Sequence, residues 1–126
     1  MEVKTFDQLD GRVLANIRQY LRKMGINPKT REETVRWAKK KFYGWTYGNT
    51  IYFKVVRSKR EMLDTIIHEW VHWKRKNLGV YKYKTPRQKF TEETLATYVA
   101  EKYTGKKPVL ANVAKRTLKK YDYFNK

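Results

Sequence analysis

The chain has only two histidines, and both lie in one short stretch, IIHEWVHW, as His68 and His72. On a helix of 3.6 residues per turn, such a pair lies about 40° apart on one face, one turn above the other. This is the spacing at which two imidazoles reach one zinc ion. Glu69 lies about 100° round from His68, so it is turned away from direct ligation but can reach a water on the metal.

The chemistry that this motif supplies is metal-assisted hydrolysis. Zinc lowers the pKa of a bound water toward ~7, and a nearby carboxylate accepts a proton as that water attacks a polarised carbonyl. His68-Glu69-x-x-His72 places these parts in one helical turn, with Glu69 as the general base. The alternative is that two imidazoles stand on the surface or at the core edge of a basic helix.

A catalytic zinc site usually takes three protein ligands, so the histidine pair requires a partner. The chain has no cysteine and no third histidine, which leaves a carboxylate. The acidic residues downstream are Glu92, Glu93, Glu101 and Asp122. Glu92 and Glu93 stand at the start of a predicted helix, where favourable charge at a helix N-terminus is the alternative role for either of them.

The pattern predicts that the histidines lie on a helix over residues 58–78. Ser58 is a plausible N-cap, and Gly79 ends the periodic pattern. Apolar side chains occupy half or more of the helix circumference, and they are Met62, Leu63, Ile66, Ile67, Trp70, Val71 and Trp73. We therefore expect this helix to be largely buried, with its histidine face turned into a cleft.

Other elements are predicted on both sides of this helix. Residues 44–57 predict a β hairpin turning at Gly48-Asn49, with a strand near 50–56. After the histidine helix, Pro86 argues against a long regular element, and Thr91 can cap a third-ligand helix over 91–104.

The two ends of the chain predict further helices. The N-terminal part, 1–43, has a helix from Phe6 to Met24 and a second one opened by a capping box of Thr30 and Glu33. The basic face of the second helix is either solvated or phosphate-binding, and its residues are Arg31, Arg36, Lys39, Lys40 and Lys41. A C-terminal helix is predicted over 108–120, ahead of an aromatic tail, YDYFNK.

Together these elements predict a single α+β domain over 1–126, with four or five helices packed on a short β hairpin or small sheet. The predicted sheet has an edge strand near 50–56. The N-terminus lacks an apolar leader, and no window approaches 18 apolar residues, so we expect a soluble, cytoplasmic protein that does not span a membrane.

The chain carries a formal net charge of +18, spread along its whole length. Such a surface attracts polyanions, nucleic acid above all, although a lysine-rich surface also suits a thermophilic source. Aromatic residues interleaved with the basic ones could stack on exposed bases, and they are Trp37, Phe42, Tyr43 and Trp45. Binding to nucleic acid is therefore an expectation beside hydrolysis.

From about 45 to 103, the order of strand, HExxH helix, connection and glutamate-bearing helix resembles the gluzincin branch of zincin metallopeptidases. The closest likeness is to the small, minigluzincin-like kind, with some similarity to SprT-like proteases. In gluzincins the ligand Glu is followed by Ala or Ser at +3, and EETLAT matches with Glu93 as the ligand and Ala96 at +3. Glu92 is the alternative third ligand, with Leu95 at +3. Thr97 stands where the family usually places a carboxylate that hydrogen-bonds a ligand His.

The resemblance implies a zinc metalloendopeptidase in which His68, His72 and Glu93 hold Zn²⁺ and Glu69 activates the water. It also implies that Tyr83 or Tyr81 stabilises the oxyanion. The strand near 50–56 would align an extended protein or peptide substrate. The alternative function is a basic nucleic-acid-binding protein with a structural or vestigial metal site, or a nucleic-acid-associated protease. The oligomeric state stays open.

Overall fold

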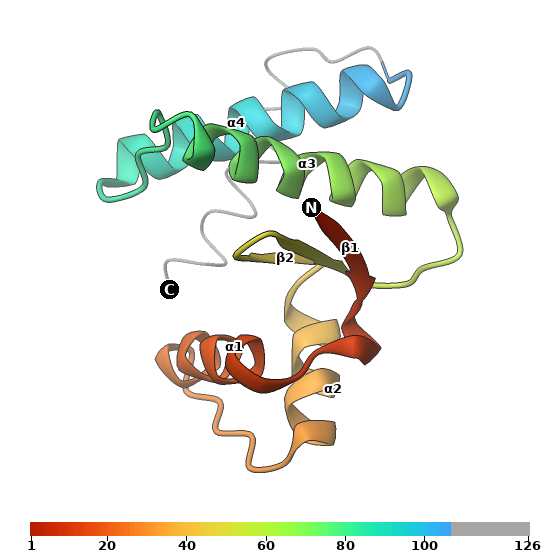
Figure 1. Ribbon diagram of the computed structural model, residues 1–126, viewed down its shortest axis with the longest axis vertical. Coiled ribbons are helices and arrows are strands. Elements are labelled where there is room, and N and C mark those ends of the chain that lie inside the picture. The colour runs from red at the N-terminus through yellow and green to blue at the C-terminus, as the bar shows by residue number, and fades with distance from the viewer. Residues whose placement is uncertain (107–126) are drawn as a thin grey trace. The chain divides into compact units, whose positions relative to one another are not determined.

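The computed structural model describes residues 1–106, and they belong to two compact units (Figure 1). The first unit is Met1–Arg57, and the second begins at Ser58. The described residues are α+β, with four α-helices and a three-stranded sheet. The prediction of one domain over 1–126 stays a prediction, and the predicted helix 108–120 and aromatic tail lie outside the described residues.

The sheet belongs to the first unit and has the strand order β1-β3-β2. Strand β2 (Gly44–Tyr47) and strand β3 (Thr50–Phe53) form the predicted antiparallel hairpin, and Gly48 takes a positive φ of 57° at its turn. Strand β1 (Glu2–Thr5) pairs with β3 in parallel.

The prediction of an edge strand near 50–56 is therefore wrong, because β3 lies between β1 and β2. Both of its edges are hydrogen-bonded, so an extended substrate cannot pair with it. The cause is the unpredicted strand β1, whose four residues, EVKT, carry little pattern of their own. Their pairing partner lies far along the chain, so only the tertiary fold identifies them as a strand.

Helix α1 (Gly11–Lys23) and helix α2 (Arg31–Lys41) pack in the first unit around one apolar core. The predicted helix from Phe6 is wrong at its start, because a short 3₁₀ helix, η1 (Phe6–Gln8), comes first and α1 begins only after Asp10. The core residues are Phe6, Leu9, Val13, Leu14, Ile17, Leu21, Val35, Ala38, Phe42 and Tyr52. Because Phe42 is buried among them, the expectation that its ring stacks on exposed bases is also wrong.

The N-terminus of α2 is capped as predicted by Thr30, whose Oγ1 accepts a hydrogen bond from the Glu33 amide at 3.1 Å. The Glu33 carboxylate reaches one residue further back than a capping box requires and accepts from the Lys29 amide at 2.9 Å. Two members of the predicted basic face bind η1 and the residue after it. Arg31 donates to the Asp7 and Leu9 carbonyls, and Lys39 pairs with the Asp7 carboxylate.

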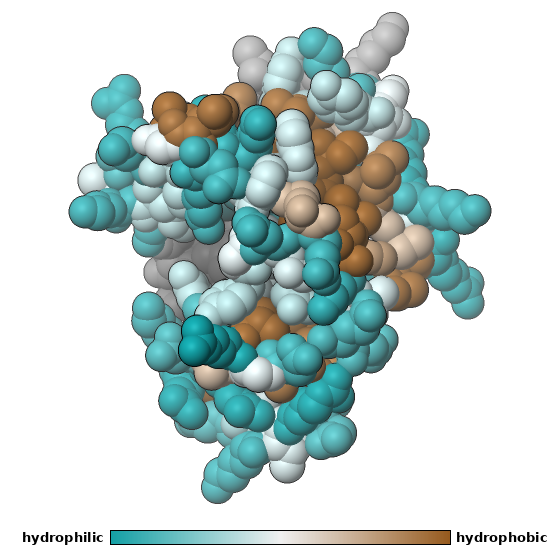
Figure 2. All heavy atoms as spheres, viewed as in Figure 1, coloured by the Kyte–Doolittle hydropathy of each residue, from teal (hydrophilic) through white to brown (hydrophobic). Residues whose placement is uncertain are grey.

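In the second unit, helix α3 (Lys59–Asn77) carries the two histidines. As predicted, Ser58 is its N-cap, accepting from the Glu61 amide at 3.2 Å, and the chain turns at Gly79 after its last residue. The helix is less buried than predicted, because Leu63 and Trp70 are exposed. Apolar atoms accordingly appear over α3 on the face shown in Figure 2.

Helix α4 (Pro86–Tyr103) begins earlier than the predicted 91–104. Pro86 does not interrupt a helix here but starts one at the first helical position, where a missing amide hydrogen costs nothing. Thr85 is the N-cap, and Gln88 completes a capping box. Glu92 and Glu93 are therefore well inside the helix, and their predicted alternative role at a helix N-terminus is wrong.

Helices α3 and α4 lie side by side and antiparallel (Figure 1), since Arg75 contacts Glu92 while His68 contacts Thr97. Ala96 and Ala100 are fully buried on α4. Their small side chains let the two helices approach closely, so polar groups of the facing turns come within bonding distance. Neither these nor the other described helices are long and apolar enough to cross a membrane.

Candidate metal centre

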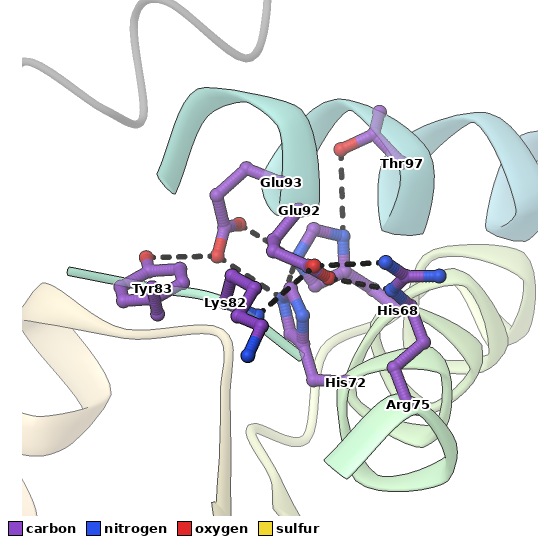
Figure 3. Close-up of polar contacts among 8 residues, drawn as sticks. All are labelled: His68, His72, Arg75, Lys82, Tyr83, Glu92, Glu93 and Thr97. Carbon is purple, nitrogen blue, oxygen red and sulfur yellow. Dashed lines mark hydrogen bonds and ion pairs between the residues drawn. The ribbon is translucent and has the colours of Figure 1, made fainter. Parts of the chain in front are cut away.

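The side chains of His68, His72 and Glu93 converge between α3 and α4 (Figure 3). The two imidazole Nε2 atoms lie 3.1 Å apart. The Glu93 carboxylate spans them, with Oε2 2.9 Å from Nε2 of His68 and Oε1 3.0 Å from Nε2 of His72. Each of the three residues is less than a tenth exposed. The structure thus brings together the histidine pair and one of the two predicted glutamates.

These distances fit a shared metal ion. Ligand atoms about 2.0–2.1 Å from a tetrahedral zinc ion are roughly 3.3 Å apart, so a small outward shift would accommodate one. Hydrogen bonds from protonated nitrogens fit the cluster less well than a metal ion does. If each Nε2 donates to Glu93, the two N–H groups face each other across 3.1 Å. A cation that accepts a lone pair from all three groups removes this conflict, so the cluster could hold a metal ion.

Without a metal ion, the electrostatics of the cluster favour the charged forms of Glu93 and His72. Burial by itself would raise the pKa of Glu93, but hydrogen bonds and charge from His68 and His72 outweigh it and hold that pKa well below its ordinary range. Burial likewise disfavours the charged form of His72, but the hydrogen bond and charge of Glu93, with a contribution from Glu69, raise its pKa. Glu93 is therefore an anion, as a metal ligand must be.

Thr97 contacts one of the two histidines of the cluster. Its Oγ1 lies 3.4 Å from Nδ1 of His68, one turn along α4 from Glu93, and it is buried. An Nδ1–H group that donates to this oxygen leaves the lone pair of His68 on Nε2, facing the centre of the cluster. The Thr97 hydroxyl is thus positioned to orient the His68 ring.

The two predicted oxyanion tyrosines lie beside the cluster. The Tyr83 hydroxyl donates to Oε1 of Glu93 at 3.0 Å (Figure 3). The Tyr81 ring meets the His72 ring edge-on at 5.6 Å and stacks on Tyr83 at 5.3 Å. In this structure Tyr83 therefore supports a candidate ligand, and the stabilisation of an oxyanion by either tyrosine stays a prediction.

Glu92, the alternative third ligand, binds another partner. Its carboxylate is 2% exposed and forms a two-pronged ion pair with Arg75, at 2.7 Å to Nε and 2.9 Å to the terminal nitrogen Nη2. The Lys82 amide also approaches it, at 3.4 Å. Both of its oxygens are thus bound outside the group formed by the histidines and Glu93.

Glu69, the predicted general base, is partly buried on α3 beside His68. Its charge contributes to the raised pKa of His72, after burial and the larger contributions of Glu93, so its carboxylate acts on the cluster from close range. Its role as general base stays a prediction.

Sequence reasoning overlooked Arg75 and the contact of Thr97 with His68. Thr97 stands four residues after Glu93, so the i, i+4 spacing alone places both on one face of α4. Arg75 stands three residues after His72 and could have been found in the same way. What the spacing does not give is the register of the two helices, which decides which glutamate Arg75 meets.

Comparison of the chain with protein-family models, with curated proteins and with solved structures found no match in any of the three.

Proposed function

We propose that this chain is a zinc-dependent metallopeptidase that hydrolyses peptide bonds. The observation that carries the proposal is the convergence of two imidazole nitrogens and one carboxylate within 2.9–3.1 Å in a buried place. The His₂Glu donor set is a known catalytic zinc set, which leaves a further position for water or substrate. Zinc held there would polarise a substrate carbonyl and supply a water of lowered pKa.

The residues of the chain have separate tasks in this proposal. His68, His72 and Glu93 hold the ion, and Thr97 and Tyr83 keep two of these ligands in orientation through their hydroxyl groups. The Glu69 carboxylate accepts a proton from the water that attacks the peptide carbonyl, as the helical position after the first ligand allows. The substrate class is protein or peptide.

The test combines metal content with peptide hydrolysis. Elemental analysis of the purified full chain is expected to find one zinc per molecule in the wild type and in Glu69→Gln. Hydrolysis of a mixed fluorogenic peptide library is expected to fall by a factor of about 10² to 10⁴ in Glu69→Gln, because the proton acceptor is lost.

Glu61→Gln is the matched control, because Glu61 is an exposed glutamate on the same helix. It should retain both zinc and hydrolysis. Full activity in Glu69→Gln, or a wild type without metal, would refute the proposal. Stoichiometric zinc without any hydrolysis would refute the peptidase and leave a structural metal site.

A further inference from the structure

The first unit has exposed tyrosines with lysines beside them, and none of these residues belongs to the candidate metal centre. Tyr43 is 60% exposed and Tyr20 is 46% exposed, so both rings present much of their surface to solvent. We name this the tyrosine–lysine surface, formed by Tyr20, Lys23, Tyr43 and Lys54. We propose that it binds single-stranded nucleic acid.

A chain of ring contacts links Tyr20 to Phe42, the residue beside Tyr43. The Tyr20 ring meets Trp45 edge-on at 4.9 Å, and Trp45 lies 4.8 Å from Phe42, the residue before Tyr43. The backbone of Tyr43 is joined to Lys54, whose amide donates to its carbonyl at 2.8 Å. Phe42 and Trp45 pack on the core, so they anchor the two exposed tyrosines to a rigid support.

A lysine stands over each exposed tyrosine. The Lys23 ammonium lies 5.2 Å from the Tyr20 ring centre, and the Lys54 ammonium lies 5.5 Å from that of Tyr43. Neither lysine forms an ion pair with a carboxylate among the described residues. Each ring is therefore next to a positive charge that is available to a phosphate.

The end of α2 extends the positive charge. Lys40, three residues before Tyr43, has its ammonium 4.9 Å from the centre of the half-buried Trp37 ring. By contrast, Arg31 and Lys39 of the same helix are bound by η1 and by the carbonyl of Leu9. Lys40 therefore adds a positive charge beside an aromatic ring, whereas Arg31 and Lys39 are bound by other groups.

Single strands are the polyanions that use both features. Their bases are unpaired, so each presents an aromatic face that can stack on a tyrosine, while the phosphates meet the lysines. A duplex hides its bases in the stack and would contact only the lysines. The net charge of +18 brings any polyanion to the protein, and the tyrosines select the single strand.

The experiment measures fluorescence anisotropy of labelled oligothymidylate and oligouridylate with the full chain, over a salt series that includes about 100 mM. We expect binding that weakens as salt rises and that unlabelled duplex displaces poorly. Tyr43→Ala with Tyr20→Ala should lower the affinity about fivefold or more, because each stacked base contributes through its ring. Tyr43→Ala alone gives the same direction if the double variant fails to fold, since Tyr43 is the more exposed ring.

Charge variants separate this surface from general attraction. Lys23→Gln with Lys54→Gln should weaken binding and reduce its salt dependence, whereas Lys84→Gln with Lys102→Gln removes the same charge from exposed positions of the second unit and should change binding little. Equal effects of the two pairs, equal binding of duplex, unchanged affinity in Tyr43→Ala, or no binding near 100 mM salt would each overturn the proposal. Zinc content should be unaffected in all these variants, so the outcome is independent of the proposed peptidase.

Discussion

Glu92 and Glu93 are neighbours on α4, yet the structure predicts opposite consequences when each is changed to glutamine. Glutamine keeps the size of the side chain and removes its charge. Glu93 faces the two histidines, whereas Glu92 faces Arg75. Only Glu93→Gln should therefore abolish the stabilisation that zinc provides, and only Glu92→Gln should break a buried ion pair.

The loss in Glu92→Gln follows from its burial and its partner. The carboxylate is 2% exposed and receives two hydrogen bonds from Arg75, of 2.7 and 2.9 Å. Glutamine can accept one of them, and the Arg75 side chain, 29% exposed, can partly turn to water. We expect the free energy of unfolding to fall by about 1–3 kcal/mol, both with zinc and with a chelator.

The loss in Glu93→Gln is of a different kind. A ligand that binds only the folded state stabilises it by about 2.7 kcal/mol at a free concentration 100 times its dissociation constant. For a chain of this size, that corresponds to a rise of roughly 10 °C in the melting temperature. The wild type and Glu92→Gln should show this zinc-dependent increment, whereas Glu93→Gln should lose most of it.

The assay is urea or thermal unfolding of each protein in EDTA and in buffered zinc, with metal content measured in parallel. Glu61→Gln, at an exposed position of α3, is the control and should follow the wild type in both buffers. An increment that survives in Glu93→Gln and disappears in Glu92→Gln would refute the reasoning, because the third ligand would then be Glu92.

Three further predictions concern the contacts around the cluster. Thr97→Val keeps the shape of the side chain but removes the oxygen that lies 3.4 Å from Nδ1 of His68. The dissociation constant for zinc, measured by competition with a chromophoric chelator, should therefore rise about tenfold. An unchanged constant would show that the contact does not orient the ring. Ala100→Leu should lower the free energy of unfolding by about 1–3 kcal/mol in urea titrations and also weaken zinc binding, because Ala100 is fully buried where the helices approach; a fully stable variant would contradict the close packing. In EDTA, the pKa of His72 is raised above its ordinary 6.5 and that of Glu93 is lowered below its ordinary 4.5, both against the opposing effect of burial. The stability that the His72 shift contributes is therefore complete below pH 6.5 and is lost as pH rises through the folded pKa. The stability that the Glu93 shift contributes is complete above pH 4.5 and is lost as pH falls through the folded pKa. The metal-free protein should therefore be most stable between about pH 4.5 and 6.5, and a free energy of unfolding that keeps rising above pH 6.5 in a chelator would contradict this.

The elements predicted well are those specified by nearby residues. Ser58 caps α3 and Thr30 caps α2 through hydrogen bonds that reach three residues along the chain. The β2–β3 hairpin turns at Gly48, where the sequence Gly-Asn separates two short β-branched and aromatic runs. Because these interactions are local, the sequence contains all the groups that make them.

The elements predicted badly depend on partners far along the chain or on position within a helix. Strand β1 forms because it pairs in parallel with β3, and the residues EVKT have no pattern that predicts this pairing. The sequence pattern predicts that Pro86 argues against a long regular element, but proline is equally suited to the first turn of a helix. Thr85 and Gln88 cap helix α4 at this point, so Pro86 starts the helix.

The spacing of His68 and His72, the helix that carries them and the few acidic residues that could join them all follow from the order of residues in the chain. The tertiary structure decided that Glu93 joins the histidines while Glu92 meets Arg75, and that Thr97 reaches His68. The physical reason is that a helix repeats every 3.6 residues, so adjacent glutamates point about 100° apart. Which of them faces the cluster depends on how α4 is rotated against α3, and that rotation is set by close packing at the interface.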